Sequence, residues 1–191
     1  MTLDLLPGDV LLTRATGLVP AFIRFGERVR YQGWWRALWH AAQKAVGVAQ
    51  PDMPGDPWYI SHAAVCVGPG RLIEALAAGL AASPVAKYSG KPVVAVPLAR
   101  LVPDVTDTDR ARAVRFAQTQ LARHDRYGWL SIASIILQLV TPLRLDISWD
   151  GAVICSAFAA QCLEHAGVTL ATRSSLTTTP ADLAAMAAHL P

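Results

Sequence analysis

The chain has 191 residues and a mass of 20.4 kDa, a length that one hydrophobic core can serve. Hydrophobic residues make up 53% of it and charged residues 16%, and this balance excludes an intrinsically disordered chain. The net charge of +3 is too small to indicate a nucleic-acid-binding protein. Three cysteines are too few, and odd in number, for a disulfide scaffold, so we expect either thiols in a reducing compartment or a reactive thiol.

Aliphatic runs and turn residues predict the elements of the first half. Gly8–Arg14, Ile60–Val67, Arg71–Leu76 and Val93–Val96 are expected strands, and Gly68-Pro69-Gly70 joins the second and third as a hairpin. Between the first two strands, apolar residues at helical spacing predict one helix from Leu18 and another over Trp34–Val46. Residues 50–57 hold three prolines and a glycine, which indicate a loop.

Helix signals dominate the second half. Thr106 or Thr108 is suited to cap a helix through Leu121, and Cys155–Ala166 is expected to form a helix that stops at Gly167. Thr179 begins a last helix to about His189. Strands followed by helices indicate a single α+β domain over residues 1–191, in which an antiparallel sheet packs against the Cys155 helix and residues 18–57 are an insertion.

The longest stretch without charge, Tyr127–Leu143, raises the question of a membrane span. It has 17 residues, at the lower limit of roughly 17–25 for a spanning helix, and polar residues and a proline interrupt it. We interpret Trp129–Val140 as a buried helix. Met1–Gly8 lacks the regions of a secretory signal. The expected location is therefore the cytoplasm, or delivery by another machinery such as a phage particle or a secretion apparatus.

The insertion carries the positive charge of the chain. Leu18–Gly47 contains five basic residues and one acidic residue, a local charge of +4, so the remainder is −1. Its run of Trp34, Trp35, Arg36 and Trp39 has two interpretations. The helix either packs over the core, or it binds a membrane surface, an acyl chain or an anionic polymer, because Trp and Arg suit an apolar–polar boundary. Nucleic acid would require more charge.

Cys155 is the strongest candidate for chemistry, because Gly151 ends a loop just before the predicted helix that begins at the cysteine. Free N–H groups and the helix dipole at that position stabilise a thiolate. His62, at the start of a predicted strand, is the candidate base. If the hairpin pairs Val67 with Arg71, Ala64 lies opposite Glu74, and Glu74 becomes a diagonal neighbour of His62. A register shift of one residue would turn Glu74 to the other face.

Four motifs in this order resemble those of permuted NlpC/P60 papain-like enzymes, the YiiX/YebB-like group. In ordinary NlpC/P60 enzymes the cysteine helix comes first, whereas here it comes last, as in the permuted branch. The resemblance extends from about Pro7 to His189 and is weaker over residues 18–57. Its motifs are Pro7-Gly8-Asp9-Val10-Leu11-Leu12, Ser61-His62-Ala63-Ala64-Val65-Cys66-Val67-Gly68, Leu72-Ile73-Glu74-Ala75 and Ile154-Cys155-Ser156-Ala157-Phe158.

The resemblance implies that Cys155 is the nucleophile, His62 the general base and acid, and Glu74 the residue that orients His62. Tyr127 resembles an aromatic residue near the site of relatives, and we expect it to line the substrate site with Trp58 and Ser156. Members often have an acidic residue where Ala157 stands, so no role is transferred to that position.

An amide or peptide bond, first of all in cell-wall peptide, is the substrate that the resemblance implies. An acyl lipid, cleaved or transferred through the same thioester on Cys155, is the second possibility, and neither requires a metal or a nucleotide cofactor. The competing class is a non-catalytic binding or structural module of a larger assembly.

The other two cysteines and Asp9 have simpler interpretations. Cys162 and Cys66 are interpreted as packing residues, although Cys66 shares a strand face with His62 and is a candidate for the edge of the site. The sequence contains neither a C-x₂-C nor an H-x₃-H spacing, so a zinc site is not favoured. Asp9 follows a turn glycine and is expected to orient the strand entry.

Overall fold

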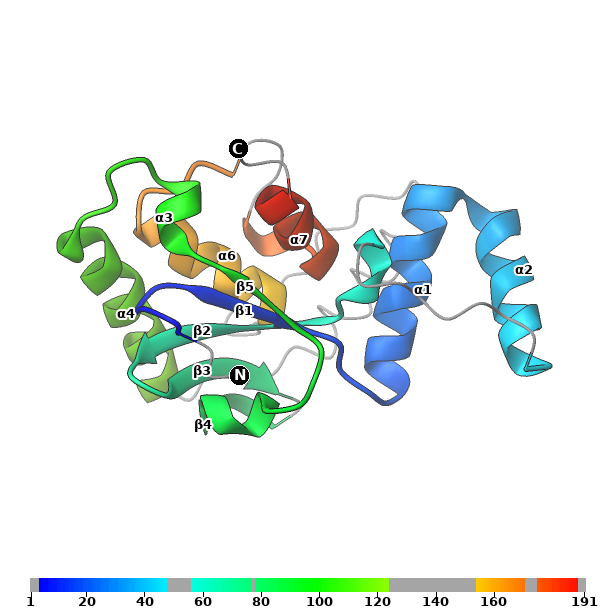
Figure 1. Cartoon of the computed structure of the whole chain (residues 1–191), viewed down its shortest axis with the longest axis horizontal. Coiled ribbons are helices and arrows are strands. Elements are labelled where there is room, and N and C mark those ends of the chain that lie inside the picture. The colour runs from blue at the N-terminus through cyan, green and yellow to red at the C-terminus, as the bar shows by residue number, and fades with distance from the viewer. Residues whose placement is uncertain (1–3, 48–55, 77, 124–153, 171–174, 189–191) are drawn as a thin grey trace.

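The structure is a computed structural model that describes residues 4–47, 56–76, 78–123, 154–170 and 175–188. These residues form an α+β fold around a five-stranded antiparallel sheet of order β4-β3-β2-β1-β5 (Figure 1). The strands are β1 (Val10–Thr13), β2 (His62–Gly68), β3 (Arg71–Leu76), β4 (Gly79–Pro84) and β5 (Val93–Val96). All four predicted strands are confirmed. β4 was not expected, because Leu80 is its only large apolar side chain and no alternating pattern results.

Most helices follow the last strand, as predicted, and two more lie between β1 and β2, where the insertion was expected. The helices are α1 (Leu18–Gln32), α2 (Trp34–Ala45), α3 (Leu98–Leu101), α4 (Asp107–Ala122), α6 (Cys155–His165) and α7 (Pro180–Ala188), with short 3₁₀ turns η1 (Pro57–Tyr59), η2 (Val85–Tyr88) and η3 (Ser175–Thr177). Thr106 rather than Thr108 caps α4, in a capping box with Asp109. The helix predicted over Trp129–Val140 lies outside the described residues. Among the described helices, none has both the length and the apolar character that crossing a bilayer requires.

The two faces of the sheet are covered differently. On one face, Val10, Val65 and Ile73 pack against apolar side chains of α4, α6 and α7. On the other face, alternate residues such as Leu11, Ala64 and Leu72 form a smaller cluster with Leu5 and Tyr88. Because successive residues of a strand point to opposite faces, His62 and Glu74 belong to the smaller face, with Ala64 and Leu72.

The β2–β3 hairpin has the register that the site requires. Ala64 lies opposite Glu74, as predicted, and Cys66 lies opposite Leu72. The expected pairing of Val67 with Arg71 is wrong, because a bulge leaves Val67 without a partner and Gly68 faces Arg71 instead. The irregularity lies beyond Cys66, on the turn side, so it does not move Glu74 to the other face.

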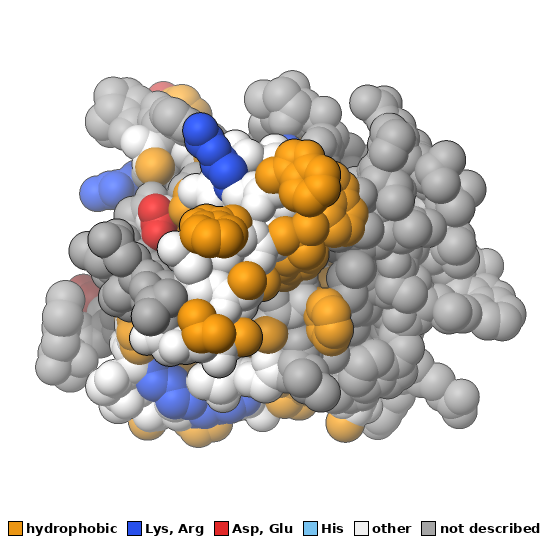
Figure 2. Space-filling view, turned by 90° about the vertical axis from the view of Figure 1, so that its right-hand side faces the viewer, with side chains coloured by type: hydrophobic (Ala, Val, Ile, Leu, Met, Phe, Trp, Pro, Cys, Tyr) orange, Lys and Arg blue, Asp and Glu red, His pale blue; other side chains and the backbone are white. Residues whose placement is uncertain are grey.

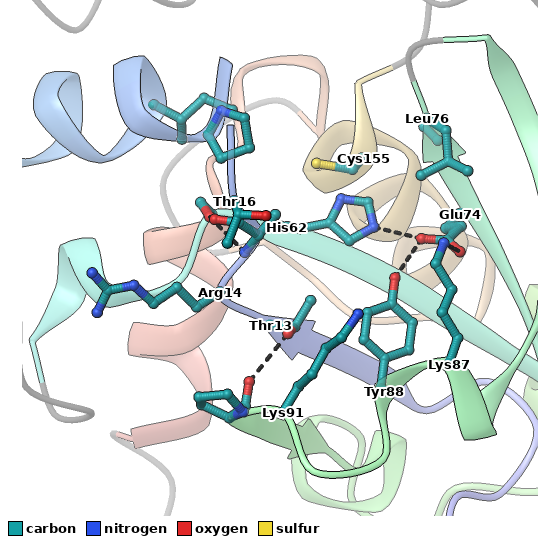
Figure 3. A pocket seen from close by; sticks show the side chains of 16 residues that line it. Thr13, Arg14, Thr16, His62, Glu74, Leu76, Lys87, Tyr88, Lys91 and Cys155 are labelled. Atoms are coloured by element: carbon teal, nitrogen blue, oxygen red, sulfur yellow. Dashed lines mark hydrogen bonds and ion pairs between the residues drawn. The ribbon is translucent and has the colours of Figure 1, made fainter. Parts of the chain in front are cut away.

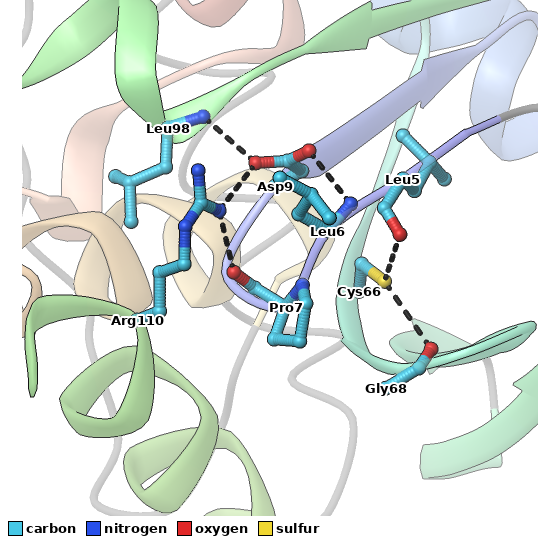
Figure 4. A network of polar contacts seen from close by, with 8 residues as sticks. All are labelled: Leu5, Leu6, Pro7, Asp9, Cys66, Gly68, Leu98 and Arg110. Atoms are coloured by element: carbon cyan, nitrogen blue, oxygen red, sulfur yellow. Dashed lines mark hydrogen bonds and ion pairs between the residues drawn. The ribbon is translucent and has the colours of Figure 1, made fainter. Parts of the chain in front are cut away.

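Asp9 fixes the entry to β1, as expected, through both of its carboxylate oxygens (Figure 4). Oδ2 accepts from the Leu6 N–H at 2.9 Å, whereas Oδ1 accepts from the Leu98 N–H and the Arg110 guanidinium, each at 2.9 Å. Cys66 lies beside this network, with its sulfur 3.4 Å from the Gly68 carbonyl oxygen. Cys66 is therefore four residues from His62 along β2 and does not lie at the edge of the site.

The insertion between β1 and β2 extends away from the sheet, with α2 as the outermost helix in Figure 1. α1 contacts η1 and α2, and its Arg30 forms an ion pair with Asp182 of α7 at 3.0 Å. Glu27, on the same helix, is completely buried near Thr179 and Asp182. Neither of its carboxylate oxygens has a hydrogen-bond partner of good geometry among the described residues. Burial, together with the charge of Asp182, raises the pKa of Glu27 to about 7.

Glu27 is expected to make the protein less stable as the pH rises. Its folded pKa lies above its unfolded value, so its stabilising contribution is complete below pH 4.5 and is lost as the pH passes about 7. The loss amounts to roughly 3 kcal/mol. Glu27→Gln should therefore unfold at higher denaturant concentration than wild type at pH 8 and at a similar concentration at pH 4.5.

Glu164→Gln is the matched control, because Glu164 is exposed on α6. It should leave the pH dependence unchanged. Equal effects of Glu27→Gln at pH 4.5 and pH 8 would contradict the raised pKa of Glu27.

Candidate active site

Cys155 is the first residue of α6, as the sequence predicts. Ile154 before it is extended, with φ −98° and ψ 150°, so the helix begins at the cysteine itself. N–H groups in the first turn of a helix have no intrahelical partner, and they present partial positive charge to a group at this end. The side chain is buried against Ala75 and Ala157 but reaches a pocket, where Figure 3 shows its sulfur beside the His62 ring.

His62 stands between the thiol and a carboxylate. It is the first residue of β2, and its Nε2 donates to Glu74 Oε2 at 2.7 Å (Figure 3). Because Nε2 is held by Glu74, Nδ1 is the ring nitrogen left for Cys155. The structure therefore brings together all three residues that the sequence singles out, from β2, β3 and α6.

Charges within this row favour an ion pair between cysteine and histidine. Burial by itself would raise the pKa of the Cys155 thiol, but His62 and the N–H groups of Ala63 and Ser156 lower it below its ordinary value. Burial by itself would lower the pKa of His62, but Cys155 and Glu74 raise it to about 9. Both shifts favour the charged thiolate–imidazolium pair over the neutral thiol and imidazole.

Glu74 is held by two further groups that sequence reasoning missed. Its Oε2 also accepts from the Tyr88 hydroxyl at 2.5 Å, and its Oε1 lies 2.5 Å from Lys87 Nζ (Figure 3). Although burial opposes ionisation, the bonds from His62, Lys87, Ser83 and Tyr88 hold the pKa of Glu74 well below its usual range. The carboxylate is thus a fixed anion behind His62. Lys87 and Tyr88 belong to η2, a short turn with no motif in the sequence to mark it.

A pocket of about 550 Å³ opens onto Cys155 and His62. This volume suits a small ligand or one end of a larger one. Its wall combines apolar and basic side chains. Pro20 and Ile23 of α1 line it together with Leu76, and Arg14, Lys87 and Lys91 supply the basic groups.

The three residues predicted to line the substrate site have different positions. Trp58 is buried, and the guanidinium carbon of Arg28 lies over it, 4.8 Å from the centre of the Trp58 ring. Trp58 is not part of the pocket wall. The Ser156 side chain is also buried and outside the pocket wall, because the second residue of α6 turns into the core. The Ser156 N–H, however, donates to the Cys155 sulfur. These two placements correct the prediction. Tyr127 lies outside the described residues.

The remaining cysteines differ from Cys155 in their surroundings. Cys162, on the same helix, is completely buried in the main core, and burial raises the pKa of its thiol far above the ordinary value. Burial likewise raises the pKa of Cys66. Both thiols are therefore protonated packing residues, as the sequence indicates, and they serve as internal references for the reactivity of Cys155.

Comparison with known proteins adds no relative. A scan against protein-family models and a search of curated proteins both find no match for this chain.

Proposed function

We propose that the protein is a cysteine-dependent hydrolase of the papain-like type, which acts through a thioester on Cys155. The observation that supports this function best is the row Cys155–His62–Glu74, in which a buried carboxylate holds the histidine at 2.7 Å and the cysteine faces a pocket. The order along the chain, with histidine and glutamate before cysteine, agrees with the permuted arrangement of NlpC/P60 enzymes. A helix that starts at the nucleophile and packs on β2 is also in keeping with that fold.

In the proposed reaction, the Cys155 thiolate attacks the carbonyl carbon of the substrate. The Cys155 N–H, at the start of α6, is positioned to stabilise the oxyanion of the tetrahedral intermediate. As that intermediate collapses, the bond to the leaving group breaks and the His62 imidazolium protonates the leaving group. Neutral His62 then takes a proton from water, whose oxygen attacks the thioester; the C–S bond breaks and releases the acid and the Cys155 thiolate, beside the His62 imidazolium. Glu74 keeps the ring oriented throughout.

An amide or peptide bond is the first substrate class, with cell-wall peptide as the first candidate. The basic side chains Arg14 and Lys91 in the pocket wall favour an acyl donor that carries carboxylates. The apolar part of the wall, with Pro20, Ile23 and Leu76, favours the second candidate, an acyl lipid. Incubation with muropeptides and with acyl-lipid mixtures, each followed by mass spectrometry of products and of acylated Cys155, distinguishes the two.

Alkylation across pH tests the catalytic pair without a known substrate. Iodoacetamide should modify Cys155 faster than an ordinary thiol at pH 7, and the rise of its rate with pH should come at lower pH, because the pKa of Cys155 is lowered from the ordinary ~8.5. In His62→Ala the rate should instead rise through pH 8.5 and beyond. Peptide mapping by mass spectrometry assigns each modification to its cysteine.

Cys66 and Cys162 in the same protein are the reference thiols, and both should stay unmodified while the protein is folded. The proposal fails if Cys155 reacts no faster than an ordinary thiol and His62→Ala leaves its rate unchanged. That outcome would favour a non-catalytic module that retains the fold.

A further inference from the structure

α2 exposes its large apolar side chains instead of burying them. Its outward side, which we call the α2 apolar face, consists of Trp35, Leu38, Trp39 and Val46 just after the helix, with exposed fractions of 84%, 43%, 68% and 73%. Figure 2 shows hydrophobic side chains gathered at this end of the molecule. Large apolar side chains clustered on a surface mark a site of interaction.

The cause lies in how α2 rests on α1. Ala37 is the one buried residue of α2, a helix that the structure describes completely, and Trp34 adds an edge contact with the Phe25 ring of α1. At 100° per residue, Trp35, Leu38 and Trp39 lie on one side of the helix and Ala37 on another. An amphipathic helix normally turns its apolar side to the core. In α2 this side is turned to solvent.

The charges around the α2 apolar face are positive. Arg36, next to Trp35 on α2, is exposed, whereas Glu27, the one acidic residue of Leu18–Gly47, is completely buried. A groove of about 360 Å³ runs beside the face and is lined by Arg36, Trp35 and Trp39 together with residues of α1. Arginine in a groove beside tryptophan matches a phosphate group that is attached to an apolar chain.

We propose that the α2 apolar face docks on an anionic phospholipid surface. Trp35, Leu38 and Trp39 enter the boundary between headgroups and acyl chains, and Arg36 contacts the phosphates. A second copy of the chain fits less well, because it would bring two positive surfaces together. The inference does not depend on the proposed chemistry at Cys155. α1, which carries α2, also lines the pocket through Pro20 and Ile23, so docking would hold the pocket near the lipid.

Flotation of the full chain with vesicles tests the docking. We expect binding to vesicles of phosphatidylcholine and phosphatidylglycerol, weaker binding at high salt, and little binding to phosphatidylcholine alone. Trp35→Ser/Trp39→Ser should weaken binding at least about tenfold. Arg36→Gln should weaken binding to the anionic vesicles about fivefold and leave binding to the neutral ones unchanged.

Two controls separate docking from folding and from chemistry. Leu6→Ser removes another exposed apolar side chain, on a residue 52% exposed, and should bind as wild type does. Cys155→Ala should also bind normally, which separates this proposal from the proposed function. Circular dichroism and the unfolding midpoint show that each variant is folded.

Absence of wild-type binding to anionic vesicles overturns the proposal, and two companion measurements identify the alternative occupant. If the wild type is a dimer by light scattering and Trp35→Ser/Trp39→Ser is a monomer, a second copy covers the face. If the wild type is a monomer and the same variant has a lower unfolding midpoint, a segment of the same chain covers it. The uncharged stretch Tyr127–Leu143, outside the described residues, is the first such segment to examine.

Discussion

Cys155→Ala is expected to abolish turnover and, in the same protein, to lower the pKa of His62 below its wild-type value of about 9. Burial favours the neutral imidazole, and the charge of the Cys155 thiolate is the strongest of the effects that oppose it. Without the thiolate, Glu74 alone remains to hold the proton on His62. An NMR titration of the His62 ring measures the change directly.

Cys162→Ala is the control, because it removes a buried thiol from the same helix that is not part of the row. It should leave both turnover and the His62 titration unchanged. A His62 pKa that stays near 9 in Cys155→Ala would show that the thiolate is not its cause. For the wild type, kcat/KM should fall above about pH 9, where the imidazolium loses the proton that the leaving group needs.

Glu74→Gln is expected to reduce kcat/KM by up to about 10⁴-fold, the loss that follows when a catalytic histidine loses the carboxylate behind it. The neutral amide cannot accept from His62, Tyr88 and Lys87 together, so the His62 ring loses its fixed orientation. Removal of one partner from this buried cluster should also lower the free energy of unfolding by roughly 3 kcal/mol near neutral pH. Steady-state kinetics and denaturant unfolding measure the two effects.

Tyr88→Phe provides the graded comparison, because it removes one of the two bonds to Glu74 Oε2 and keeps the ring. We expect a loss of about 1 kcal/mol in stability and less than about a tenfold change in kcat/KM.

Since the folded pKa of Glu74 is depressed, the stabilisation that Glu74 provides is present above pH 4.5 and is lost as the pH falls below that value. Glu74→Gln should therefore approach the wild type in stability in acid. Wild-type kinetics in Glu74→Gln would rule out the positioning role.

Local signals were sufficient to predict most of the described fold. Short aliphatic runs marked β1, β2, β3 and β5, and capping residues such as Thr106 and Thr179 marked the starts of helices. The pairing of Ala64 with Glu74 followed from the hairpin. β4 was missed because its ladder to β3 depends on backbone bonds rather than on a side-chain pattern. The exposure of α2 could not be predicted, because an apolar stripe on a helix does not indicate what covers it.

The three central site residues could be found because Cys155 and His62 begin their elements and the hairpin register places Glu74 beside His62, but the groups that support them could not. Tyr88 and Lys87 reach Glu74 because β4 brings η2 back over β3, which is a tertiary consequence. Trp58 was expected to line the substrate site. The structure turns it instead to Arg28 of α1. Aromatic residues near a catalytic motif are as well suited to packing as to binding.

The base and the nucleophile lie far apart along the chain. His62 and Glu74 belong to the described residues before 124, and Cys155 to those after 153. One cut between these positions would break no described helix or strand, yet it would leave half of the reactive row on each fragment. Thioester formation would then require the fragment with α6 to reassociate on β2 and α4, which α6 contacts in the intact chain. Under the proposed function, the turnover of mixed fragments would measure the affinity of one fragment for the other.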